Sequence, residues 1–114
     1  MEKYLIVMAG LPGTGKTFTT IKLCQYLEGY TSISQNDLRR DAGMKKMHKT
    51  FDNILRQIDI KTKNLLENNQ GVIVDSVNRY LFRRHQLYGV ASCCDKKVIT
   101  LECVCVQKKK LKKE

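Results

Sequence analysis

The stretch Gly10-Leu11-Pro12-Gly13-Thr14-Gly15-Lys16-Thr17 decides how the rest of this sequence is interpreted. It follows an apolar run at 4–9 and precedes a helical pattern at 18–28, so the Walker A spacing has its required strand-loop-helix context. Glycines let the backbone approach an anion, and the loop N–H groups and the positive end of the helix attract phosphate. We therefore expect residues 10–17, together with Phe18, to form a nucleotide-binding loop.

Two side chains of this stretch have defined chemical uses. Lys16 supplies a positive charge for the β- and γ-phosphates, and the hydroxyl of Thr17 is suited to hold Mg²⁺. A third group comes from Asp75, which ends the apolar run Gly71-Val72-Ile73-Val74 in a Walker B pattern. Asp75 could instead be an ordinary residue at the start of a helix, but its position after a buried strand favours a metal ligand.

The length and composition indicate one domain with a basic tail. The chain has 114 residues and a formal net charge of +10, to which the lysines at 108–110 and 112–113 contribute heavily. We expect a nucleotide-binding domain at 1–106 and a basic tail at 107–114. The five cysteines are an odd number without a CxxC pair, which is typical of reduced thiols in the cytoplasm. No stretch is long and apolar enough to span a bilayer, so we expect a soluble protein without a membrane partner.

Apolar periodicity predicts alternating strands and helices. Expected strands are residues 3–9, 30–34, 71–75 and 97–106, and expected helices are 18–28, a long one after Thr50 ending near 68–69, and 78–91. Residues 39–49 are basic and lack an apolar period, which predicts a loop or a short irregular helix. The alternation predicts an α/β fold with three layers and a short parallel sheet of about four strands.

The same periodicity predicts which helix residues face the core. For the first helix these are Phe18, Ile21, Leu23, Cys24 and Leu27. For the later helices the expected core residues are Phe51, Ile54, Leu55, Ile58, Leu65, Leu66, Val77, Tyr80, Leu81, Leu87 and Tyr88.

Charged residues follow the second and third strands, where open α/β sheets bind their ligands. Asp37, Arg39 and Arg40 come after residues 30–34, and Arg79, Arg83 and Arg84 come after Asp75. Arginines in these positions could bind an anionic acceptor or the transferred phosphate through paired hydrogen bonds. The alternative is that they are solvated charges on the surface, and for Arg83 and Arg84 an exposed helix face is an equally good interpretation.

Three blocks taken together resemble one branch of the P-loop kinases. They are residues 10–17, then Ser34-Gln35-Asn36-Asp37-Leu38-Arg39-Arg40, then Val72-Ile73-Val74-Asp75-Ser76-Val77-Asn78 followed by Arg83-Arg84. The branch includes polynucleotide 5′-hydroxyl kinases of the phage type, the kinase domains of RNA-repair ligases, and the zeta-toxin and chloramphenicol phosphotransferase relatives. The resemblance covers most of residues 3–106 and implies ATP as phosphate donor, Mg²⁺, and transfer to a hydroxyl, with a nucleic acid 5′ end as one acceptor and a small molecule as another.

The resemblance also implies roles for individual residues. Lys16 and Arg39 would be catalytic, and Arg39, Arg40, Asn78 and Arg83 would bind the acceptor. The family's general base is an Asp three residues before an Arg, and Asn36 has that spacing from Arg39 here. A neutral amide cannot accept the proton, so Asp37 would take over or transfer would be slow.

Two other functions remain open from the sequence. The family continues past the fourth strand with an arginine-bearing lid and a final strand, whereas this sequence ends in the lysine-rich segment. The first alternative is a nucleotide-binding module with weak or no catalysis that binds nucleic acid or a protein partner. The second is a simple NTPase, with water as the acceptor.

Overall fold

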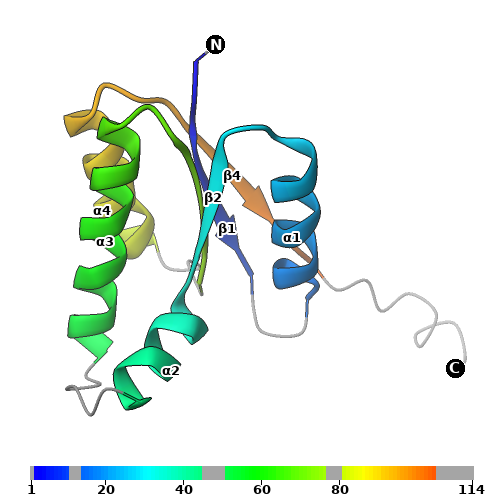
Figure 1. Cartoon of the computed structure of the whole chain (residues 1–114), viewed down its shortest axis with the longest axis vertical. Helices are drawn as coiled ribbons and strands as arrows, with labels where there is room; N and C mark the ends of the chain where they lie inside the picture. The colour runs from blue at the N-terminus through cyan, green and yellow to red at the C-terminus, as the bar shows by residue number, and fades with distance from the viewer. Residues whose placement is uncertain (1, 11–13, 45–50, 77–80, 105–114) are drawn as a thin grey trace, which may run out of the picture.

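The computed structural model describes residues 2–10, 14–44, 51–76 and 81–104. Strands and helices alternate along the chain, except that two helices follow one another between the second and third strands (Figure 1). In chain order the elements are β1 (Leu5–Ala9), α1 (Lys16–Tyr26), β2 (Tyr30–Ser34), α2 (Gln35–Met44), α3 (Phe51–Glu67), β3 (Gly71–Asp75), α4 (Leu81–Cys93) and β4 (Val98–Glu102).

The four strands form one parallel sheet in the order β2-β3-β1-β4. Leu5 of β1 is opposite Val72 of β3 on one side and opposite Val98 of β4 on the other. Because β1 and β3 are central and covered on both faces, all five residues of each are buried. This confirms the predicted α/β fold with a short parallel sheet of four strands.

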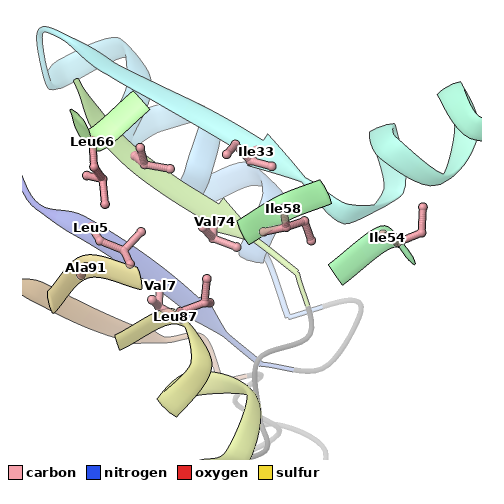
Figure 2. Packing of buried hydrophobic residues seen from close by; sticks show 10 residues of the cluster. Leu5, Val7, Ile33, Ile54, Ile58, Leu66, Val74, Leu87 and Ala91 are labelled. Carbon is pink, nitrogen blue, oxygen red and sulfur yellow. The ribbon is translucent and has the colours of Figure 1, made fainter. Parts of the chain in front are cut away.

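Helices cover both faces of the sheet and make three layers, with α1 on one side and α3 and α4 on the other (Figure 1). The larger core cluster lies between the sheet and the α3–α4 layer. In Figure 2, Leu5 and Val7 of β1 pack with Leu87 and Ala91 of α4. Full burial of one such aliphatic side chain stabilises the fold by about 1.5–3 kcal/mol. The remaining buried members of the cluster are Ile33, Ile54, Ile58, Leu66, Val72 and Val74.

The predicted apolar face of α1 is partly wrong. Leu23, Cys24 and Leu27 pack against Ile6, Met8 and Ile73 of the sheet, as expected. Phe18 and Ile21, however, are 66% and 53% exposed. They lie on the opposite side of the helix from the face that carries Thr20, Leu23 and Leu27, because 3.6 residues complete one turn. Apolar residues surround α1, so periodicity alone could not identify its buried side.

Residues 39–49 were expected to be a loop or a short irregular helix, and for the part that the structure describes the loop is wrong. α2 is a regular helix up to Met44. It begins where Ser34 Oγ accepts a hydrogen bond from the backbone N–H of Asp37 at 3.3 Å. Leu38 packs on the core cluster as an apolar anchor. A capped first turn and one anchor therefore form a short helix that has no apolar period.

Other predicted bounds differ by a few residues. β1 begins at Leu5, α1 begins at Lys16, and β4 covers only Val98–Glu102 of the expected 97–106. Leu81 was expected in the core but is 56% exposed in the first turn of α4. Thr50, Val77 and Tyr80 lie outside the described residues, and the side chain of Phe51 is likewise not described. No helix in the described part of the chain is long and apolar enough to cross a membrane.

Candidate functional site

The parallel sheet brings the ends of three strands to one edge. Ala9 of β1 leads into the glycine-rich segment, Asp75 ends β3, and Ser34 ends β2 next to α2. Carboxyl ends of parallel strands are where α/β sheets bind ligands. The described residues at the carboxyl ends of these strands, one from each of three separate sequence blocks, therefore lie at one edge of the sheet.

Two described residues of the glycine-rich segment (residues 10–17), Gly10 and Gly15, have backbone angles that favour glycine. Gly10 has φ +145°, and a Cβ there would lie 2.7 Å from the carbonyl oxygen of Cys103. Gly15 has φ +84° and is the N-cap of α1. Both φ values favour glycine. A Cβ would collide with Cys103 at Gly10 but would meet no atom within 4 Å at Gly15, so only Gly10 also lacks the space for a side chain.

The start of α1 suits an anion. No side chain caps it in the described structure, and its first turn contains no acidic residue. The N–H groups of a first helical turn have no partners within the helix, and the helix dipole adds partial positive charge there. Lys16, the first residue of α1, adds a full charge to the same place. Together these groups form a positive site directly after the glycine-rich segment.

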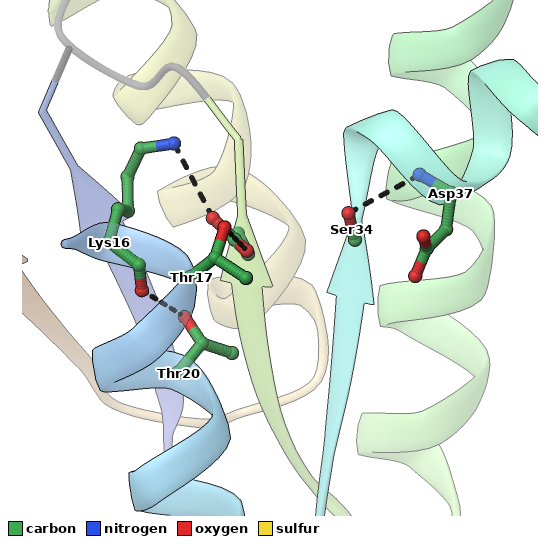
Figure 3. A network of polar contacts seen from close by, with 6 residues as sticks. Lys16, Thr17, Thr20, Ser34 and Asp37 are labelled. Carbon is green, nitrogen blue, oxygen red and sulfur yellow. Dashed lines mark hydrogen bonds and ion pairs between the residues drawn. The ribbon is translucent and has the colours of Figure 1, made fainter. Parts of the chain in front are cut away.

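Lys16 and Thr17 both reach across to β3, where they contact the carboxylate of Asp75. Thr17 Oγ1 donates a hydrogen bond to Asp75 Oδ2 at 2.9 Å, and Lys16 Nζ lies 3.4 Å from Asp75 Oδ1. The side chains of Lys16 and Asp75 are only 11% and 5% exposed. Figure 3 shows these contacts, with Thr20 Oγ1 bonded to the carbonyl oxygen of Lys16 one turn below.

This donor set fits Mg²⁺. A hydroxyl and a carboxylate offer hard oxygen ligands, which Mg²⁺ prefers, and it commonly takes one or two protein oxygens with the rest from phosphate and water. The described residues include no cluster of three or more His, Cys, Asp or Glu side chains that could enclose a metal. Thr17 and Asp75 would therefore hold the ion on one side and leave its other positions to a ligand.

The first turns of α2 carry the next group of predicted site residues. Asp37 forms an ion pair with Arg40, with 2.6 Å between Oδ1 and Nη2, and both side chains are more than half exposed. Asn36 and Arg39 are also exposed. Figure 3 shows Ser34 and Asp37 at the end of the strand beside β3. The structure thus brings α2 to the same sheet edge as Lys16 and Thr17, with Asp37 bound to a neighbouring arginine.

Arg83 does not lie with these residues but is buried between α4 and α3. It is 6% exposed on α4, and its Nη1 is 3.0 Å from Asp59 Oδ1 on α3. Nη1 also donates a hydrogen bond to Gln86 Oε1 at 3.1 Å. The exposed helix face, one of the two interpretations of Arg83, is therefore wrong, and its role in acceptor binding stays a prediction that none of these contacts supports. Arg84 is half-buried.

Some predicted site residues lie outside the part that the structure describes. They are Leu11, Pro12 and Gly13 of the glycine-rich segment, Asn78, Arg79, and the tail at 107–114. Phe18 is described and is exposed, with Lys22 Nζ 5.5 Å from the centroid of its ring.

Sequence reasoning assigned no role to two residues that shape the site. Ser34 caps α2, and the spacing of Ser34 and Asp37 is a recognisable capping signal. The backbone of Cys103 lies against Gly10, and its N–H donates a hydrogen bond to the carbonyl oxygen of Ala9 at 2.8 Å. No sequence pattern links Cys103 to a position more than ninety residues earlier in the chain.

Solved structures with similar folds were found. A chain of the "Pnkp1/Rnl/Hen1 complex" superposes with a TM-score of 0.78 at 16% identity, covering 97% of this chain and 38% of that one. A structure of the Mycobacterium tuberculosis APS kinase CysC in complex with AMPPNP and APS superposes with a TM-score of 0.72 at 15% identity, covering 98% of this chain and 68% of that one. This chain thus spans well under half of the length of the Pnkp1 complex chain. The fold is that of the P-loop kinases.

Comparison with a family model identifies the family to which the chain belongs. The model described as chromatin associated protein KTI12 matches residues 4–114, so the chain belongs to the KTI12 family. No curated protein matches the sequence. The expected resemblance to P-loop kinases is confirmed.

Proposed function

We propose that the protein binds ATP with Mg²⁺ at the carboxyl edge of its sheet and transfers the γ-phosphate to a hydroxyl, with a nucleic acid 5′ end as the acceptor we favour. The observation that carries the proposal is the meeting of Lys16 and Thr17 on the carboxylate of Asp75. A cation and a hydroxyl at the start of a helix, facing a carboxylate at the end of a strand, form a site for phosphate with a divalent cation.

Each residue has a task in this reaction. The start of α1 and Lys16 bind and orient the phosphates, and Thr17 and Asp75 would hold Mg²⁺, which when bound neutralises charge between the β- and γ-phosphates. Phosphoryl transfer depends mainly on positioning and charge neutralisation, so these groups supply most of what the donor side needs. We assign the nucleotide site to Gly10, Leu11, Pro12, Gly13, Thr14, Gly15, Lys16, Thr17 and Phe18.

The acceptor side of the proposal lies on α2. Asp37 would accept the proton of the attacking hydroxyl, with Asn36 at the position where related kinases have an Asp. Arg39 and Arg40, with Asn78 beyond the described residues, would bind an anionic acceptor. The net charge of +10 favours a polyanion, and one fold neighbour is described as part of an RNA repair complex.

A second candidate function is supported by the ion pair on α2. Asp37 is held at 2.6 Å by Arg40, so its carboxylate must leave this pair before it can contact an acceptor hydroxyl. Together with the amide at Asn36, this supports a nucleotide-binding module with weak catalysis. A simple NTPase is the third candidate, and phosphate release that no added hydroxyl compound stimulates would support it.

One experiment separates these functions. The native chain, Asn36→Asp and Lys16→Met are each incubated with γ-labelled ATP, Mg²⁺ and either 5′-hydroxyl oligonucleotides or a panel of small hydroxyl compounds. We expect label on the oligonucleotides with the first two proteins and none with Lys16→Met. Transfer should weaken as salt is added, because phosphate contacts release counterions. If the native chain and Asn36→Asp bind ATP but label nothing, the kinase proposal is wrong and the module is supported.

A further inference from the structure

Asp75 engages the two side chains that the proposed nucleotide would need. Its Oδ2 accepts a hydrogen bond from Thr17, and its Oδ1 faces Lys16 Nζ at 3.4 Å. The Lys16 and Asp75 side chains are both almost fully buried, so water has little access to either charge. In this arrangement the carboxylate of Asp75 pairs with the ammonium group of Lys16, which would otherwise bind phosphate.

We propose that Asp75 opposes the binding of metal-free polyphosphates at the phosphate site, so that the site prefers a polyphosphate accompanied by a divalent cation. This inference rests on the proposed function, and it concerns how that site is regulated. Lys16 would leave Asp75 when it binds phosphate, and the hydroxyl of Thr17 carries no charge to replace it. A buried carboxylate that loses its partner is strongly unfavourable. A divalent cation bound at Asp75 removes that penalty.

The consequence is a thermodynamic coupling between the two ligands. Polyphosphate releases Asp75 from Lys16 and so favours the cation, and the cation favours polyphosphate by the same factor. Couplings between sites are typically about 5–150-fold, so we expect Mg²⁺ to tighten ATP binding by a factor in this range, about tenfold. The contact length supports an exchangeable pair, since 3.4 Å is longer than the roughly 2.7–2.9 Å of a tight charge-assisted hydrogen bond.

The variant Asp75→Asn gives the sharpest test, because it removes the negative charge and keeps the shape. Binding of ATP, AMPPNP and tripolyphosphate is measured by calorimetry, once in EDTA and once in Mg²⁺. We expect Asp75→Asn to bind metal-free polyphosphates about tenfold more tightly than the native chain. Mg²⁺ should then add little to its affinity. Glu67→Gln is the matched control, since it removes one exposed carboxylate at the far end of α3 and should leave all these affinities unchanged.

Two further variants separate this effect from a general change of charge. If Asp75 acts by holding Lys16, the gain from Asp75→Asn must disappear in the background of Lys16→Met. A double-mutant cycle on unfolding by urea, without any nucleotide, should also show that the two residues stabilise each other in the free protein.

The outcomes distinguish this inference from the function on which it rests. If the native chain binds no nucleotide with or without Mg²⁺, the proposed function is wrong. If the native chain binds ATP but Asp75→Asn does not bind the metal-free form more tightly, the inference about Asp75 is overturned and the nucleotide site stands. A gain that persists without Lys16, or an equal gain in Glu67→Gln, also overturns it.

Discussion

The guanidinium of Arg83 and the carboxylate of Asp59 form an ion pair of 3.0 Å inside the interface between α4 and α3. The pair is unequal, since the side chain of Arg83 is 7% exposed and that of Asp59 is 30% exposed. In the described structure, Nε and Nη2 of Arg83 are buried without a hydrogen-bond partner, and so is Oγ1 of Thr62, three residues after Asp59 on α3. Apart from the hydrogen bond to Gln86, the guanidinium of Arg83 therefore depends on the single carboxylate of Asp59.

We predict that replacing Asp59 destabilises the protein more than replacing Arg83. Asp59→Ala leaves a buried guanidinium unpaired, so the free energy of unfolding should fall by about 3–5 kcal/mol. Arg83→Met leaves a carboxylate that water can reach, so the loss should be smaller, about 1–2 kcal/mol. Unfolding by urea measures both. Asp59→Leu combined with Arg83→Met should recover most of the stability, and a double variant less stable than Asp59→Ala would contradict this account.

The effect of a glycine-to-alanine substitution on protein stability should depend on the space and the backbone angle at each position. Gly10→Ala has both a positive φ and a collision with the carbonyl oxygen of Cys103, so it should be the most destabilising. Gly15→Ala meets no atom within 4 Å and pays only for its φ of +84°, about 1–2 kcal/mol. Gly89→Ala in α4 has open space and no positive φ, so it should stabilise the protein by about 0.4–1 kcal/mol. Thermal unfolding of the three variants checks this order.

The strands were the part of the fold that the sequence predicted best. β2 and β3 have the predicted bounds because turn and cap residues border them, with Gly29 before β2 and Gly71 and Asp75 at the ends of β3. Lys16, Thr17 and Asp75 were expected to meet because parallel strands place them at one edge, and this geometry holds. Their functional roles remain predictions.

The packing of the helices could not be predicted in the same way. Apolar residues occur on both sides of α1, and only the contact with the sheet decides that Leu23 rather than Phe18 is buried. Arg83 shares a helical face with Leu87 and Ala91, at spacings of four and eight, which was a usable signal of burial. Its partner Asp59 lies 24 residues earlier, however, and no sequence pattern connects the two.

Asn36→Asp should improve both stability and the proposed transfer reaction. Asn36 is exposed in the first turn of α2, where a carboxylate interacts favourably with the helix dipole, by about 0.3–1 kcal/mol. As a general base it could raise the transfer rate by up to about 10²–10⁴-fold. Single-turnover transfer with labelled ATP measures the rate, and Asn64→Asp on the exposed face of α3 is the control for the charge change. Equal rates for the native chain and Asn36→Asp would argue against a base at this position.

Two adjacent thiols should react at different rates with an alkylating agent. Burial raises the pKa of Cys94 above its usual value, with a further contribution from the carboxylate of Glu67, and its Sγ contacts the carbonyl oxygen of Lys63 at 3.8 Å. Cys93 is exposed at the end of α4. Because the thiolate is the reactive form, Cys94 should react more slowly than Cys93 near neutral pH. A raised pKa in the folded state also means that ionisation of this thiol favours unfolding as the pH rises through and above 9.0.

Peptide mapping after brief treatment with iodoacetamide measures both rates in one sample. Glu67→Gln removes the carboxylate and should speed the reaction of Cys94, because the charge of Glu67 contributes to the raised pKa of that thiol. The exposed thiol of Cys93 is the internal reference. Equal labelling of the two thiols in the folded protein would show that Cys94 is not protected by its burial. Alkylation after unfolding in urea provides the reference, since the difference between the thiols should then largely disappear.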